Sequence, residues 1–129
     1  MSYYFSKKVD YSFDEAIDKI TAELKEEGFG ILTEIDVKAT LKNKIDVDFR
    51  NYKILGACNP PFAHKALQAE SQIGIMLPCN VVVQDSIDGD GIDVSVMNPM
   101  EAMSVVKNEE MGQIAEEVTK RLKSALDRI

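Results

Sequence analysis

Two long amphipathic segments, one near each end of the chain, most constrain its fold. The first opens with Ser12 and Glu15, a capping box that satisfies free amide groups at a helix start. Gly28 is expected to end it in the left-handed conformation that glycine adopts without strain. A helix with one apolar stripe must pack it against another layer. The stripes are Phe13, Ala16, Ile17, Ile20 and Leu24 in the first segment, and Met111, Ile114, Ala115, Val118, Leu122, Leu126 and Ile129 in the last.

Five other stretches have the composition of β-strands. β-Branched and aromatic residues are dense at residues 3–9, 29–35, 52–58, 79–84 and 92–96. The turn sequence at residues 88–91, Asp-Gly-Asp-Gly, separates the last two, which we expect to form a hairpin. This order of elements predicts an α+β fold in which an antiparallel or mixed sheet carries helices on one side.

Short helices are expected where a polar residue precedes an apolar pattern. Asp36 comes before apolar residues spaced four apart and is expected to cap a short helix. Asn59 and Asn98 are each followed by proline, which fits the first turn of a helix because no amide donor is needed there. We therefore expect both asparagines to act as N-caps, with the Asn59 side chain accepting a hydrogen bond from the amide of Phe62.

Length and charge narrow the classes of function. The 129 residues fit one domain, which we take as residues 1–129. A formal net charge of −7 disfavours nucleic-acid binding, because the overall field repels phosphate. The sequence shows no signal peptide and no apolar run of membrane-spanning length. We therefore predict no membrane association and a cytoplasmic location, where thiols stay reduced.

A pair of Cys-Asn dipeptides is the most unusual local feature. Cys58-Asn59 ends one predicted strand and Cys79-Asn80 begins the next. If these strands are antiparallel, both dipeptides lie at the same end of the sheet, and binding residues are often found where strands give way to loops. The candidate ligand-binding residues are therefore Cys58, Asn59, Cys79 and Asn80, with Met97 near the edge of the same pocket.

Several interpretations of the two cysteines stay open. They can be inert core residues, since free cysteine is often buried. They can line a pocket in a small-molecule or partner-binding module, which is the interpretation we favour. They can also serve a thiol-dependent enzyme, or a redox or sulfur-handling protein, in which Cys58 or Cys79 reacts. A zinc site with His64 is disfavoured because no Cys-x-x-Cys spacing occurs, and neither a metal nor a cofactor is predicted.

The run from Tyr52 to Val83 resembles the domain of unknown function 302 family. The resemblance is most specific at residues 55–60, Leu-Gly-Ala-Cys-Asn-Pro, and at residues 77–83, Leu-Pro-Cys-Asn-Val-Val-Val. It extends over nearly the whole chain. It implies a curved, mainly antiparallel sheet of about five strands carrying two long helices and short connecting helices, in a TATA-binding-protein-like architecture. It also implies a homodimer, and it assigns no activity, substrate or catalytic residue.

Overall fold

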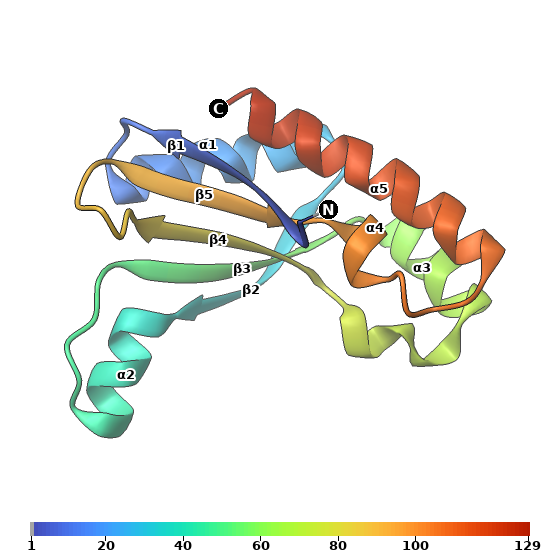
Figure 1. Cartoon of the computed structure of the whole chain (residues 1–129), viewed down its shortest axis with the longest axis horizontal. Helices are drawn as coiled ribbons and strands as arrows, with labels where there is room; N and C mark the ends of the chain where they lie inside the picture. The colour runs from blue at the N-terminus through green and yellow to red at the C-terminus, as the bar shows by residue number, and fades with distance from the viewer. Residues whose placement is uncertain (1) are drawn as a thin grey trace.

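A five-stranded sheet forms the centre of the fold in a computed structural model that describes residues 2–129 (Figure 1). Each strand is antiparallel to its neighbours, and the order β1-β5-β4-β3-β2 leaves β1 and β2 as the edges. The predicted α+β class and the predicted number of strands are confirmed. The specific likeness to the TATA-binding protein stays a prediction. The strands are β1 (Tyr4–Val9), β2 (Gly30–Asp36), β3 (Tyr52–Cys58), β4 (Cys79–Asp85) and β5 (Ile92–Met97).

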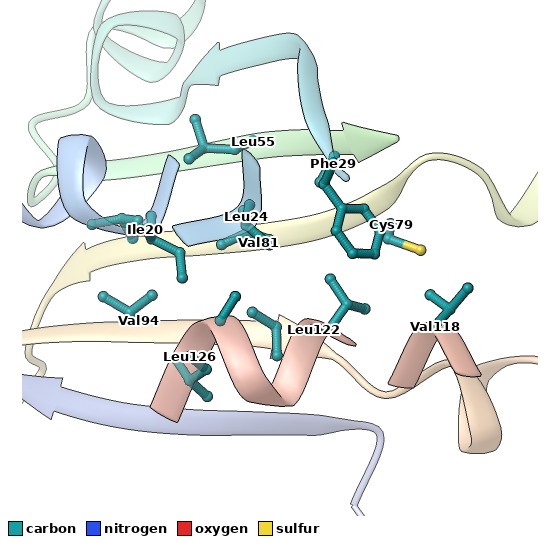
Figure 2. Close-up of a cluster of buried hydrophobic side chains, with 14 of the residues drawn as sticks. Ile20, Leu24, Phe29, Leu55, Cys79, Val81, Val94, Val118, Leu122 and Leu126 are labelled. Atoms are coloured by element: carbon teal, nitrogen blue, oxygen red, sulfur yellow. The ribbon is translucent and has the colours of Figure 1, made fainter. Parts of the chain in front are cut away.

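Two long helices, α1 (Phe13–Glu26) and α5 (Glu109–Asp127), pack on one face of this sheet and against each other (Figure 1). Their apolar stripes meet the alternate strand residues that point toward them, and these side chains form the core (Figure 2). The residues of this core with essentially no exposure include Ile20, Leu24, Leu55, Val81, Val83, Val94, Val96 and Leu122. Within residues 2–129, no helix has the length and hydropathy needed to cross a bilayer.

The ends of the long helices follow the sequence signals. The Ser12 hydroxyl accepts a hydrogen bond from the Glu15 amide at 3.1 Å, as its capping role predicts. Gly28 has a φ of 88°, so the predicted left-handed residue after α1 is confirmed. The segment after Asn98 does not form one continuous helix. It forms a short helix α4 (Pro99–Ala102), and residues 103–108 are non-helical before α5 begins. Asn108 then caps α5 by accepting from the Met111 amide at 3.2 Å.

Three shorter helical segments connect the strands. Helix α2 (Val37–Ile45) lies beside β2 and β3, is capped by Asp36 as predicted, and buries none of its residues. Helix α3 (Pro60–Ala69) and the 3₁₀ helix η1 (Ser71–Met76) fill the connection from β3 to β4. These connections place α3 and α5 near the same end of the sheet, where they pack on each other.

The β4–β5 hairpin is organised by its acidic turn. Asp88 accepts hydrogen bonds from the Ser86 hydroxyl at 2.8 Å, the Asp90 amide at 2.9 Å and the Lys8 ammonium at 2.6 Å. The Lys8 contact is the largest of the causes that lower the pKa of this carboxyl to about 2. The predicted hairpin is confirmed, and its aspartate fixes the turn and ties it to β1.

Candidate ligand-binding cavity

The antiparallel pairing of β3 and β4 brings the two Cys-Asn dipeptides to the same end of the sheet. In this register Ala57 lies opposite Cys79, and Gly56 lies opposite Asn80. Cys58 is the last residue of β3 and Cys79 is the first residue of β4. The condition on which the joint site depended is therefore met.

A cavity of about 290 Å³ adjoins both thiols. It lies where the ends of β2, β3 and β4 meet α3, α4 and α5, and Val118 of α5 lies across from Phe29 and Cys79 (Figure 2). Its volume is at the lower end of the range found for small-molecule pockets. Its wall is almost entirely apolar and comprises Phe29, Leu32, Ala57, Cys58, Asn59, Phe62, Ala63, Ala66, Leu67, Leu77, Pro78, Cys79, Pro99, Met103, Ile114, Ala115 and Val118.

A β-bulge in the edge strand shapes one side of the cavity. Ile31 pairs with Ala57 and Thr33 pairs with Gly56, so Leu32 is an extra residue in the ladder. A bulge of this kind redirects the side chain of the inserted residue. Leu32 lines the cavity and is 68% exposed, and Leu67 of α3 lines it and is 45% exposed. These two leucines mark where the cavity meets solvent.

The two thiols differ in their surroundings. Cys79 is 6% exposed, and burial, with a smaller contribution from Cys58, raises its pKa to about 11. Cys58 is half-buried, and neither cysteine forms a disulfide. Since a thiolate is the reactive form, Cys79 is a poor nucleophile at neutral pH. Across residues 2–129, no three His, Cys, Asp or Glu side chains gather in a way that could hold a metal ion.

Asn59 has a role that differs from the one predicted for it. The prediction that it caps α3 by accepting from the Phe62 amide is wrong, because its side chain makes no capping hydrogen bond. The amide Nδ2 instead donates to the Glu27 carbonyl at 3.2 Å, and the residue is 7% exposed. Gly28 makes this approach possible, since a Cβ atom there would lie 2.9 Å from Nδ2. Asn59 therefore ties the end of α1 to the start of α3.

Asn80 and Met97 do not belong to the cavity. Asn80 follows Cys79 and points to the sheet face opposite α1 and α5, where it is exposed. Met97, at the end of β5, lies on that same opposite face. A strand turns successive side chains to opposite faces, so both residues are separated from the cavity although they neighbour its wall in sequence. Among residues 2–129, the methionine that lines the cavity is Met103, just after α4.

The comparison with known proteins agrees with the sequence resemblance. The family model called Domain of unknown function DUF302 matches residues 5–129. The chain belongs to this family. It is similar to the crystal structure of the uncharacterized conserved protein DUF302 from Bacillus stearothermophilus, with a TM-score of 0.91 and 29% identity over 99% of this chain and 98% of that one. No curated protein matches the chain.

Sequence reasoning missed most of the wall that this DUF302 domain builds around its cysteines. Phe29 comes from the link between α1 and β2, Phe62 and Leu77 come from opposite ends of the link between β3 and β4, and Val118 comes from a helix far along the chain. Phe62 could have been found, because it is the first apolar aromatic after the two helix-starting prolines. The others carry no local signal that separates a cavity wall from an ordinary core position.

Proposed function

We propose that this DUF302 domain is a binding module for a small, largely apolar molecule, held in the cavity beside Cys58 and Cys79. One observation carries the proposal: an apolar cavity of about 290 Å³ reaches solvent beside two exposed leucines. Packed interiors rarely leave voids much larger than a water molecule. A space of this size with an opening is therefore typical of a ligand site.

The chemistry of the wall supports an apolar ligand. Aliphatic and aromatic side chains provide nearly all of it, and a thiol in such a setting behaves as a small polarizable hydrophobe. The Asn59 Nδ2 group already donates to the Glu27 carbonyl, and the rest of the wall is almost entirely apolar, so few polar groups are free to orient a strongly polar molecule. Ligand affinity would come from removing apolar surface from water.

The cavity can be tested by filling it. We expect 1-octanol to bind, measured by calorimetry and by chemical-shift changes at residues of the wall. Ala63→Phe places a ring in the cavity from α3 and should abolish binding. The matched control is Ala39→Phe, the same change at an exposed position of α2. Equal binding by both variants would show that octanol binds elsewhere.

The thiol-dependent alternative receives less support. Cys79 keeps its proton at neutral pH because its pKa is raised by burial, so reactivity would have to come from Cys58. Titration with a thiol reagent across pH separates the two ideas. A thiol enzyme requires Cys58 to react faster in the folded protein than in urea, whereas a binding module does not.

We also propose that the domain forms a homodimer through the open face of the sheet, defined here as the face opposite α1 and α5. Apolar side chains lie across it on all five strands: Tyr4, Ile35, Ile54, Val82 and Met97. Ile35 is 48% exposed in the single chain, and a two-fold contact between such faces would cover the patch. Sedimentation analysis over a range of concentrations tests this.

A cytoplasmic location stays a prediction that rests on the sequence.

A further inference from the structure

Two cations lie against one aromatic ring in the cavity wall. The Arg121 guanidinium carbon is 5.1 Å from the centre of the Phe62 ring, and the Lys65 ammonium is 5.6 Å from it. Both are within the range of cation–π attraction. Phe62 also lines the cavity, whereas neither cation is itself part of the wall, so the two positive groups lie beside the wall, and we call Arg121 and Lys65 the rim.

Arg121 is held at this rim from two sides. Its NH1 group donates to the Glu27 carbonyl at 3.3 Å, the same oxygen that accepts from Asn59. Val118, one helical turn earlier on α5, lines the cavity directly. The guanidinium is therefore fixed beside two residues of the wall, Asn59 and Phe62.

The acidic groups near this rim leave Arg121 available. Glu117 pairs with the Arg121 Nε at 3.2 Å, but both side chains are substantially exposed, so solvent weakens the pair. The Glu27 carboxylate is directed to Arg128, with an N···O distance of 2.8 Å. An incoming anion would compete with Glu117 alone among the acids paired to this guanidinium in residues 2–129.

We propose that the ligand of this domain is an amphipathic anion, with a short hydrocarbon tail in the cavity and a carboxylate at the rim formed by Arg121 and Lys65. The inference rests on the proposed function, which supplies the apolar site for the tail. The rim adds what the cavity lacks, a fixed positive group that a carboxylate can bind through charge-assisted hydrogen bonds.

Three ligands with the same tail test the proposal. Octanoate, 1-octanol and octylammonium differ in head group alone, and calorimetry gives the affinity of each. We expect octanoate to bind about fivefold to tenfold more tightly than octanol, and octylammonium more weakly than either. Added salt should reduce the advantage of octanoate and leave octanol unchanged, because exposed charges are screened.

Variants locate the head group. Arg121→Gln should remove the preference for octanoate while octanol affinity, which also reports a folded cavity, stays within about twofold. Glu117→Gln should act in the opposite direction and strengthen octanoate binding, because it removes the competing acid. Lys123→Gln is the matched control on the same helix and should change neither affinity, because its ammonium lies over the Phe5 ring and away from Phe62. Lys65→Gln changes an exposed position and should reduce the preference for octanoate by a smaller factor. It replaces Arg121→Gln as the test if that variant does not fold.

The outcomes separate the two proposals. If all three ligands bind alike, or octylammonium binds best, the inferred anion is wrong although the apolar site holds. An unchanged octanoate preference in both Arg121→Gln and Lys65→Gln also overturns it. If neither octanol nor octanoate binds, the proposed function is wrong, and the inferred anion is wrong with it.

Discussion

The two faces of the sheet differ sharply, and one dipeptide shows how. Cys79 points into the cavity and is almost fully buried, whereas Asn80, the next residue, is exposed on the open face. The same alternation runs along β4 and β5, where Val81 and Val96 have no exposure while Val82 and Ser95 are half-buried. A motif that crosses a strand is therefore divided between two environments, and its residues need not share a function.

The largest expected effect contrasts neighbouring valines. Val81→Asp places an unpaired carboxylate in the core and should destabilise the fold by about 4 kcal/mol or more. Val82→Asp should change the stability of the single chain by about 1 kcal/mol or less. Urea denaturation at low protein concentration measures both. If the open face is the dimer interface, Val82→Asp should also convert dimers to monomers, and a large loss of monomer stability in this variant would contradict the division into two faces.

Gly56 tests whether the open face is free of tight contacts. A Cβ atom at this position would lie 2.1 Å from the Thr33 hydroxyl oxygen and 2.7 Å from the Pro78 ring. We expect Gly56→Ala to destabilise the domain by about 1–3 kcal/mol, because the proline ring cannot simply move away. Gly30→Ala is the control and should be nearly neutral, because an added Cβ atom there would meet no atom within 4 Å apart from those of its chain neighbours. Equal melting temperatures would show that the contact relaxes easily.

The two asparagines sharpen the contrast further. Asn59→Ala removes the buried hydrogen bond to the Glu27 carbonyl and should lower the free energy of unfolding by about 1–2 kcal/mol. Asn80→Ala changes an exposed side chain and should lie within about 0.5 kcal/mol of the parent. Chemical denaturation measures the free energy of unfolding of both variants. A larger decrease for Asn80→Ala than for Asn59→Ala would indicate a contact of Asn80 on the open face.

The smallest effect concerns the buried thiol. The pKa of Cys79 is raised from 9.0 to about 11, so the folded state retains a proton that the unfolded chain loses first. Its contribution to stability is therefore complete below pH 9 and is lost as the pH rises toward 11, with about 1 kcal/mol gone near pH 10. Cys79→Ala should show less alkaline destabilisation than the parent, as read from urea midpoints at pH 8 and pH 10. Parallel curves would mean that Cys79 is not the group responsible.

The sequence predicted those parts of the fold that depend on local pattern. Ser12, Gly28 and Asp36 marked helix ends correctly because capping needs particular side chains and backbone angles at fixed offsets. The alternating residues of β5 predicted which side chains face the helices, because strand periodicity is strict. The co-location of the thiols followed as soon as β3 and β4 were known to be antiparallel.

The remainder depended on contacts between distant segments. Asn59 was assigned to its own helix, since nothing nearby in sequence announces that the Glu27 carbonyl lies beside it. Asn80 is predicted beside Cys79 because it is the next residue, and Met97 is predicted at the pocket edge because methionines cluster near Asn98, but strand alternation places both on the other face. In the sequence Arg121 is one of several charged residues on the last helix, and nothing local indicates that Phe62 of α3 packs against its guanidinium.

The bulge at Leu32 has a consequence for exchange kinetics. Strand β2 is an edge strand, hydrogen-bonded to β3 on one side, and Leu32 borders the cavity from it. Edge segments open locally at far less free energy than global unfolding requires. We therefore expect the residence time of a bound molecule to follow the opening of β2, visible as faster amide hydrogen exchange there, and to be insensitive to mutations that weaken the core beneath α1.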